Sequence, residues 1–385
     1  MALDKAVDSA QLNADLTAVA DAIRTKGGTS AQLAFPDGFV SAVQAIEGAP
    51  DLQIVVTTSA GATVTATKGS KTVSGTADAS GNCTLTVDEA GTWSVVATLG
   101  ATTKQQDVVV GTSSVVIEFV SAVLNDNAWE TIRSVSDRGE GANYWSIGDR
   151  KAVTLNGTVG HLSLSNYTTY AFIIGFNHNA SVEGANRIHF QLAKTALSGG
   201  TDVCFCDNQY GPDSGWSSPG AGYFVMNARN TNSGGWKSSQ MRTNICGTSL
   251  SSYSGTIIAV IPAALRDVLK SVTKYTDNTA NGGGSTASYV TATTDYFFLL
   301  SEFEVFGSIS YGNTNEKNKQ AQYAYYSAGN SKIKYKHNGT STAAHWWLRS
   351  TNASNSNSFM YVYADGTVAS YSAFYSLGFA PGFCV

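Results

Sequence analysis

Charged side chains are scarce in this chain. Asp, Glu, Lys and Arg account for 14% of its 385 residues, and the net charge is −4. No cluster of Lys or Arg occurs, although a nucleic-acid-binding protein needs one to neutralise phosphate groups. A disordered chain would carry more charge and fewer aromatic residues than the 11% present here. The composition therefore argues against nucleic acid as a partner and predicts a folded chain with a largely neutral surface.

Long hydrophobic runs are missing too. No stretch approaches the roughly 18–20 apolar residues that cross a bilayer, so we expect no membrane insertion. The N-terminal stretch MALDKAVDSAQLNADL has acidic residues where a signal peptide needs positive charge, and it lacks an apolar segment. We therefore expect synthesis in the cytoplasm without a signal peptide.

Cysteine is sparse, with five residues that are odd in number and widely spaced. This usage argues against a disulfide framework. Cys204 and Cys206 alternate on an expected strand, so both side chains point the same way, and a metal or redox pair is one interpretation. No second Cys/His pair stands nearby at zinc spacing. We therefore predict no metal and no cofactor, and leave open whether these two cysteines pair.

Glycine is abundant instead, with 38 residues, and the chain is longer than the roughly 250–300 residues of a single core. Its patterns define three blocks. Residues 1–48 place Leu12, Leu16 and Ile23 at helical spacing, and two short helices bury little surface alone. We therefore predict a helical segment that attaches to a larger assembly or to copies of itself. A small cap on the next domain is the alternative.

The other two blocks are richer in strands. Residues 51–119 alternate polar and apolar side chains between glycine turns, which predicts an Ig-like β-sandwich that acts as a spacer. Residues 120–385 mix short strands and helices, so the predicted fold class is α+β and β-rich. Here we expect a helix capped by Asn127, a helix through residues 263–272 after Pro262, a strand through 295–307 and a hairpin at Asp365-Gly366.

Few residues suggest catalysis, and we predict that the chain is not an enzyme. The five histidines are far apart, and the sequence has no G-x-S-x-G, H-E-x-x-H or phosphate-loop motif. Glu302 and Glu304 would share a strand face as a carboxylate pair for glycoside cleavage, but exposed strand charges explain them more simply. His189 alternates with apolar residues and is expected in the core. Arg349 follows Trp346 and Trp347, two expected core anchors, and is expected to be buried with its guanidinium on loop carbonyls.

The aromatic residues carry the strongest signal of binding. In the stretch SFMYVYADG, Met360 and Val362 share one strand face, and Phe359, Tyr361 and Tyr363 share the other. If the aliphatic face packs on the core, the three aromatic rings point to solvent. Clustered exposed aromatic rings among Ser and Asn are typical of a binding surface.

The C-terminal sequence also resembles a known family. The stretch HWWLRSTNASNSNSFMYVYADGTVASYSAFYSLGFAPGFCV is similar to the ending of a C-type-lectin-like domain family of gut bacteria and their phages. The matching residues are Trp346, Trp347, Leu348, Arg349, Ser350, Asp365, Gly366, Gly378, Pro381 and Gly382. Thr351 replaces the usual Pro, and Phe379 stands where Val is usual. The resemblance covers about residues 120–385, and LTAVADAIRTKGGTSAQLAFPDGF near the N-terminus is similar to the leader of phage tail and baseplate proteins.

Many members with this ending resemble targets of diversity-generating retroelements, which mutate adenines and prefer AAC codons. Such changes yield Ala, Ser, Tyr and Phe but never Met, and residues 369–376 contain only those four types. The resemblance thus implies a variable region at about 352–379 around the fixed Met360. The candidate ligand-binding residues are Asn357, Ser358, Phe359, Tyr361, Tyr363, Ser370, Tyr371, Ser372, Phe374 and Tyr375.

These resemblances imply a virion protein of the phage tail tip or baseplate. It would bind a host cell-surface receptor, either protein or glycan, and residues 1–48 would contact other tail or baseplate proteins and form a homotrimer. Two alternatives of other classes stay open: a tail-associated glycan depolymerase, and a bacterial surface adhesin, which would need an export route.

Overall fold

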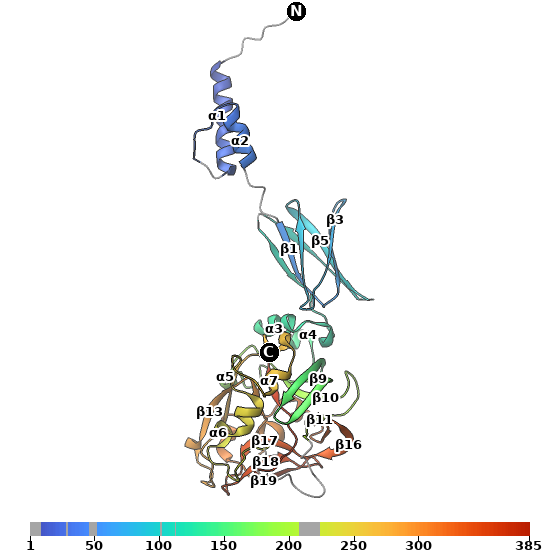
Figure 1. The fold of residues 1–385 in the computed structure, drawn as a ribbon, viewed down its shortest axis with the longest axis vertical. Helices are drawn as coiled ribbons and strands as arrows, with labels where there is room; N and C mark the ends of the chain where they lie inside the picture. Colours follow the sequence, from blue (N-terminus) through green and yellow to red (C-terminus); the bar gives the residue numbers. More distant parts are fainter. Residues whose placement is uncertain (1–8, 28–29, 46–51, 101, 112, 208–223) are drawn as a thin grey trace, which may run out of the picture. The chain divides into compact units, whose positions relative to one another are not determined.

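The computed structural model describes residues 9–27, 30–45, 52–100, 102–111, 113–207 and 224–385. Strands predominate over helices, which confirms the predicted α+β, β-rich class (Figure 1). The chain divides into two compact units. The first comprises residues 1–56, 63–76 and 83–117, and the second comprises 57–62, 77–82 and 118–385. No helix in these described ranges is long and apolar enough to cross a membrane.

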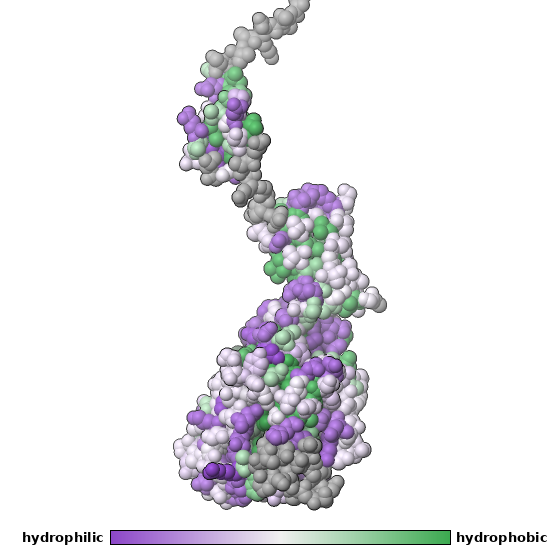
Figure 2. All heavy atoms as spheres, viewed as in Figure 1, coloured by the Kyte–Doolittle hydropathy of each residue, from purple (hydrophilic) through white to green (hydrophobic). Residues whose placement is uncertain are grey.

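The N-terminal segment consists of two helices, α1 (Ser9–Gly27) and α2 (Asp37–Ala45), as predicted (Figure 1). Ala20 is buried, but several larger apolar side chains are between 47% and 65% exposed, namely Leu12, Val19, Phe35, Val40 and Val43. Figure 2 shows hydrophobic side chains on the surface of this helix pair. The two helices thus leave apolar surface uncovered, as expected for so short a segment.

Residues 52–118 form two β-sheets. One sheet has the order β4-β1-β7, and the other has the order β3-β2-β5-β6. The bounds are β1 (Leu52–Thr57), β2 (Thr63–Lys68), β3 (Lys71–Thr76), β4 (Asn82–Val87), β5 (Gly91–Leu99), β6 (Thr102–Val110) and β7 (Val115–Glu118). Ile54 and Val56 of the first sheet and Val64, Trp93 and Val95 of the second are fully buried. The alternation read from the sequence therefore gives a buried and a solvent side to each sheet.

The C-terminal unit contains many short elements. Its helices are η1 (Leu124–Asp126), α3 (Trp129–Asp137), α4 (Gly141–Tyr144), α5 (Ala180–Glu183), α6 (Gly235–Ser238), η2 (Met241–Cys246), α7 (Ile257–Val260), α8 (Ala263–Arg266), η3 (Ala287–Tyr289), α9 (Glu302–Phe306), η4 (Thr314–Asn318) and α10 (Ala324–Ser327). Its strands are β8 (Arg150–Val159), β9 (Leu162–Phe176), β10 (Ile188–Lys194), β11 (Val203–Cys204), β12 (Val272–Asp277), β13 (Val290–Asp295), β14 (Phe297–Phe298), β15 (Lys334–Lys336), β16 (Gly339–Ala344), β17 (Trp346–Thr351), β18 (Ser358–Val362), β19 (Val368–Ser372) and β20 (Gly382–Cys384).

The core of this unit is the sheet β14-β20-β10-β9-β8. The C-terminal strand β20 lies between β14 and β10, with Phe383 paired to Phe190 and stacked on it at 5.2 Å between ring centroids. Trp129 of α3 packs edge-on against the same two rings, at 5.7 and 6.2 Å. Residues 377–385 are all buried. The last strand of the chain is thus enclosed within the central sheet.

Two predicted helix boundaries are wrong. Asn127 does not cap α3, which begins after Ala128 without a side-chain cap. The Asn127 carboxamide instead accepts a bond from the Ser121 amide at 2.7 Å and donates to the Ser121 carbonyl at 3.0 Å. The helix after Pro262 ends at Arg266, and the chain then turns with i→i−3 bonds from the Val268 amide to the Leu265 carbonyl and from the Leu269 amide to the Arg266 carbonyl, both at 3.3 Å.

The predicted strand through residues 295–307 is also wrong. Asp295 is the last residue of β13, Phe297 and Phe298 form β14, and helix α9 follows. Ser301 begins this helix: its hydroxyl accepts from the Glu304 amide at 3.0 Å, and the Glu304 carboxylate accepts from the Ser301 amide at 2.9 Å. This capping box was legible as S-x-x-E in the sequence. The helix places both Glu302 and Glu304 inside the protein, which decides their role.

Candidate functional site

The predicted ligand-binding residues lie on or next to the sheet β17-β18-β19, in which β18 is the middle strand. The predicted hairpin at Asp365-Gly366 joins β18 to β19, and Gly366 has a left-handed backbone with φ +88°. The Tyr363 amide donates to the Thr367 carbonyl at 2.7 Å, and the Gly366 amide donates to the Tyr363 carbonyl at 2.9 Å. The turn therefore fixes the register of the two strands.

This register divides the candidates between two faces of the sheet. Phe359 pairs with Tyr371, and Tyr361 pairs with Ala369, so these side chains share one face. Ser358, Ser370 and Ser372 lie on the other face, beside Met360. The Ser370 hydroxyl there accepts a bond from Asn352 Nδ2 at 2.9 Å. The candidates on β18 and β19 therefore lie on both faces of the sheet, because β19 alternates as β18 does.

The expectation that the β18 aromatics face solvent holds for only one of them. Phe359 is fully buried and Tyr361 is 5% exposed, whereas Tyr363 is 43% exposed. Met360 and Val362 on the opposite face are fully buried too. The middle strand is thus covered on both faces, and alternation alone could not reveal the second cover. Phe359 belongs to the scaffold rather than to a binding surface.

Five aromatic side chains of the hairpin region form a continuous group, which we call the aromatic row: Tyr361, Tyr363, Tyr371, Phe374 and Tyr375. Ring centroids are 6.2 Å apart for Tyr361–Tyr363, 6.1 Å for Tyr361–Tyr371, 5.0 Å for Tyr371–Tyr375 and 4.5 Å for Phe374–Tyr375. The last three rings are half-buried. Partly exposed rings that already support one another present a large contact area at low entropy cost.

The aromatic row carries no charge at neutral pH. Burial raises the pKa of Tyr361 to about 12 and that of Tyr371 to about 12, so both remain phenols. Of the other candidates, Asn357, Ser370 and Ser372 are half-buried and Ser358 is buried. A ligand on this surface would meet rings and hydroxyl groups rather than ions.

The backbone beneath the aromatic row is fixed by buried polar contacts. Asn232 is fully buried, and its Nδ2 donates to the carbonyls of Asn355 at 2.9 Å and Ser358 at 3.0 Å. Trp347, also fully buried, lies 6.2 Å from the Tyr361 ring and donates from Nε1 to the Phe224 carbonyl at 3.0 Å. Trp346 and Trp347 are core anchors, as predicted. The Asn/Ser-rich segments around the sheet are therefore well packed.

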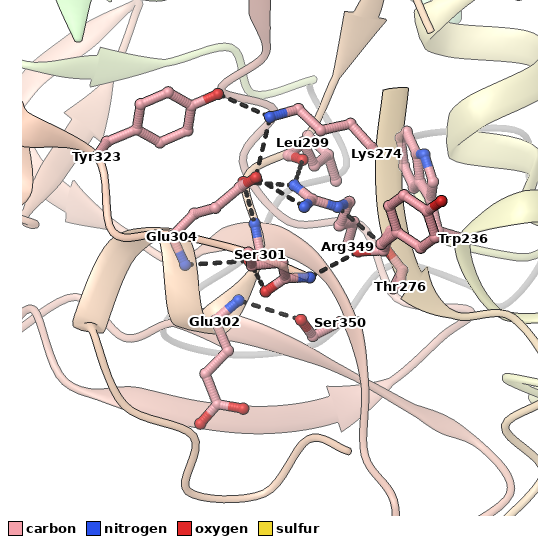
Figure 3. Close-up of polar contacts among 12 residues, drawn as sticks. Trp236, Lys274, Thr276, Leu299, Ser301, Glu302, Glu304, Tyr323, Arg349 and Ser350 are labelled. Atoms are coloured by element: carbon pink, nitrogen blue, oxygen red, sulfur yellow. Dashed lines mark hydrogen bonds and ion pairs between the residues drawn. The ribbon is translucent and has the colours of Figure 1, made fainter. Parts of the chain in front are cut away.

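A buried cluster of charges lies in the core of the same unit (Figure 3). Arg349 is fully buried, as predicted, and donates to the Leu299 carbonyl at 2.8 Å. Its main partner was not predicted: Nη1 and Nη2 bind the Glu304 carboxylate at 2.5 and 2.8 Å. Lys274 Nζ donates to Glu304 at 2.9 Å and to Glu183 at 2.6 Å. Two cations and two carboxylates therefore compensate one another without water-exposed partners.

The charges of this cluster control its protonation. Burial alone would raise the pKa of Glu304, but the charges of Arg349 and Lys274 outweigh burial and hold that pKa well below its usual range. Burial raises the pKa of Glu183 to about 7 and lowers the pKa of His178 to about 3. The imidazole beside this cluster is therefore neutral in the folded state.

His189, predicted as a core histidine, is fully buried in the same region. Its Nδ1 lies 3.1 Å from the Tyr323 hydroxyl and 3.3 Å from Cys384 Sγ. Tyr323 also accepts a bond from Lys274 Nζ at 2.8 Å, which links the histidine to the charged cluster. Because these groups are enclosed, they cannot meet a substrate.

Three of the buried side chains have the spacing of metal ligands. One donor atom each of His178, Glu183 and Glu304 lies within 4.8 Å of the others. The Lys274 ammonium stands 2.6 and 2.9 Å from the two carboxylates, where a metal ion would otherwise compensate them. A metal would have to displace this ammonium at a large cost in buried charge. The donor set therefore fits a structural ion network better than a metal centre.

The carboxylate pair considered for glycoside cleavage is not exposed. Glu302 and Glu304 are both fully buried, which corrects the expectation of exposed strand charges. Glu302 accepts bonds from the amides of Ser310, Tyr311 and Gly312 at 2.5, 3.3 and 2.9 Å. Neither carboxylate is thus placed to meet a glycosidic bond.

Cys204 and Cys206 lie close together and are buried. Their sulfur atoms are 3.8 Å apart, and both are free thiols. Burial raises the pKa of the Cys206 thiol well above its usual value, so it is a poor metal ligand and a poor nucleophile in this state. The pair thus packs as small core residues.

The sequence comparisons bear on part of the C-terminal unit. Residues 223–385 match the profile of the DUF6273 family, described as a domain of unknown function. The matched region contains β17, β18, β19 and the aromatic row. No match was found among curated proteins or among solved structures.

Sequence reasoning missed Lys274 and Glu183. Lys274 occupies the inward position of β12, between the buried Val272 and Thr276. A charged residue at an inward position of a strand requires a buried partner, and this was the available signal. Glu183 follows a left-handed Asn179 in a one-turn helix and gave no comparable signal.

Proposed function

We propose that this chain is a receptor-binding protein of a phage tail tip. Residues 118–385 would form a C-type-lectin-like scaffold, and the aromatic row would be its variable, ligand-contacting surface. The single observation that carries the proposal is a continuous row of five rings, 4.5 to 6.2 Å apart, in which the buried Tyr361 supports four rings that are exposed or half-buried. Such rings give affinity through burial and leave the fold unaffected when they vary.

The composition of the hairpin supports variation. All five members of the aromatic row are Tyr or Phe, and both types arise from an AAC codon, as the retroelement resemblance requires. Met360 does not arise in this way, and it is fully buried beneath the neighbouring strand. The proposed variable region nevertheless includes core residues, because Phe359 and Ala373 are fully buried and Tyr361 is 5% exposed. Residues 380–385, which follow the variable region, would be constant, because all of them are buried.

The N-terminal helices would attach the protein to the virion. α1 and α2 leave apolar side chains such as Phe35, 65% exposed, and Val40, 54% exposed, without cover. Contact with other tail proteins or with two further copies of this chain would cover them. A trimer would present several weak sites together and raise the effective affinity.

Binding to bacterial cells tests the proposal. The labelled chain is incubated with a panel of bacterial strains, and the Tyr363→Ala/Tyr371→Ala double variant is compared on every strain that the unaltered chain binds. We expect at least about a tenfold loss, since aromatic anchors dominate interface energies. Tyr144→Ala is the matched control, because Tyr144 is 38% exposed and lies outside the aromatic row. Unchanged binding by the double variant, or no bound strain, would contradict the proposal.

A further inference from the structure

A second part of the C-terminal unit is built to receive a ligand. A hollow of about 440 Å³ lies between the end of α3, the segment before β10, the segment before β12 and Tyr296. It lies apart from the aromatic row in sequence and in its lining. Arg133, Arg187 and Lys270 line it, and Asp137 is the single acidic side chain among its lining residues. Three cations with one carboxylate are unusual in a chain whose net charge is −4.

The single carboxylate is already shared. Asp137 lies 2.9 Å from Arg133 Nε and 2.6 Å from Lys270 Nζ. Burial would raise its pKa, but the bonds from Lys270 and Arg133 outweigh burial and lower it, so Asp137 is ionised. One negative charge thus faces three positive charges. The lining side chains retain an excess of two positive charges, which a bound anion would compensate.

The two guanidinium groups are held in place before any ligand arrives. Arg187 donates from Nε to the Ser271 carbonyl at 2.9 Å and from Nη1 to the Ala185 carbonyl at 2.7 Å. Arg133 donates from Nη1 to the Val268 carbonyl at 3.0 Å. Within the described ranges neither Nη2 has a hydrogen-bond acceptor in the structure. Groups fixed in this way lose little entropy on binding, and their open edges suit the oxygen atoms of an anion.

The floor of the hollow is rigid as well. Lys270 is 9% exposed and donates from Nζ to the Asn186 carbonyl at 2.5 Å and to the Ser136 hydroxyl at 3.2 Å. Its amide donates to the Cys384 carbonyl at 2.9 Å, which ties the floor to the central sheet. Asn186 Nδ2 donates to the Asp137 carbonyl at 2.8 Å. The cation at the base is thus fixed by the core.

We propose that this hollow binds a small ligand through an oxyanion, a phosphate or a carboxylate group, held by Arg133 and Arg187 above Lys270. The volume suits a free anion or a sugar-sized body that carries one. Tyr296 lines the same hollow and would contact the remainder of such a ligand. This inference is independent of the proposed receptor surface and would hold if that proposal failed.

Titration calorimetry on the full chain tests it with four probes. Inorganic phosphate, glucose 6-phosphate and glucuronate carry the oxyanion, and glucose is the neutral control. We expect glucose not to bind and at least one oxyanion to bind, more weakly as salt is added. Binding of phosphate alone would assign a free-phosphate site, and binding of the sugar acids would assign a saccharide site. Equal binding of glucose, or no binding by any oxyanion, would overturn the proposal.

Variants then locate the site. Arg187→Gln should weaken binding at least about tenfold, because it removes a charge-assisted contact, and Arg133→Gln/Arg187→Gln should abolish it. Asp137→Asn should strengthen binding, since it removes the competing carboxylate and retains an acceptor for Lys270. A merely structural role for Asp137 gives no such gain. Arg229→Gln is the matched control, because Arg229 is exposed elsewhere in this unit. Undiminished binding by the double variant would place the anion elsewhere and overturn the proposal.

Discussion

The charged cluster in the core and the aromatic row at the surface distribute polarity in opposite ways within one unit. The cluster places Glu183, Lys274, Glu304 and Arg349 where none is more than 3% exposed. The aromatic row places four of its five rings at least partly at the surface and contains no Asp, Glu, Lys or Arg. Ordinary globular proteins do the reverse, with rings inside and ions outside. The difference matches the two tasks that we propose, in which the inner group specifies one arrangement of the chain and the outer group varies.

The comparison shows why substitutions of exposed rings should cost the fold less than substitutions in the charged cluster. A buried ion pair tolerates few replacements, since removal of one partner leaves the other charge unpaired in the core. A partly exposed ring can be replaced at the cost of its own contacts alone. Arg349 on β17 and Tyr361 on the neighbouring β18 are one strand apart. The buried charge cluster and the proposed variable surface are therefore on adjacent strands.

The largest effect is expected when the buried charged cluster is disrupted. Glu304→Gln keeps the shape of the side chain but leaves Arg349 and Lys274 with one carboxylate fewer, so we expect a loss of about 3–5 kcal/mol in the free energy of unfolding. Urea unfolding followed by tryptophan fluorescence measures it, because six of the seven tryptophans lie in residues 118–385. Glu140→Gln is the control: Glu140 is 38% exposed in its ion pair with Arg138, and its loss should stay within about 1 kcal/mol. Similar losses for both variants would mean that burial of the pair does not matter.

Phe359→Ala tests the boundary between the two groups. Phe359 was predicted as a ligand contact, but it is fully buried under the sheet. We expect a loss of about 3–5 kcal/mol in the free energy of unfolding from the cavity, and unchanged binding by the folded fraction. Tyr363→Ala should show the opposite, with a stability change within about 0.5 kcal/mol and weaker binding to cells. If the Phe359→Ala chain is stable but no longer binds cells, Phe359 contacts the receptor after all.

The sequence predicted the strands and turns of the fold better than it predicted which strand faces are buried. The alternation of residues 51–119, the hairpin at Asp365-Gly366 and the burial of His189 and Arg349 all follow from local patterns, and all are seen. Phe359 was expected to be exposed but is buried. Period-two alternation does not show whether one face of a sheet is covered or both are. The partner of Arg349 was also out of reach, since Glu304 is 45 residues away and its helix was read as a strand. Long-range pairing of buried charges leaves almost no local trace.

The smallest expected effect concerns pH and sharpens the same comparison. Burial lowers the pKa of His178 to about 3. Below about pH 6.5 this imidazole therefore binds a proton in the unfolded chain but not in the folded chain. Stability is therefore lost as the pH falls from about 6.5 towards 3, by about 2 kcal/mol between pH 7.5 and pH 5 for this group. Glu183 has the opposite effect on stability, because its raised pKa favours the folded state at lower pH.

His178→Gln should reduce the loss of stability at low pH, whereas His161→Gln, at an exposed position, should not. The aromatic row contains no Asp, Glu, Lys, Arg or His side chain, but His345 packs against it, with ring centroids 4.3 Å from Tyr363 and 5.4 Å from Tyr361. We expect cell binding by the folded chain to stay constant from pH 7.5 to pH 5. A binding change without a change in the folded fraction, if it disappears in His178→Gln but not in His345→Gln, would show that the surface depends on the buried charges.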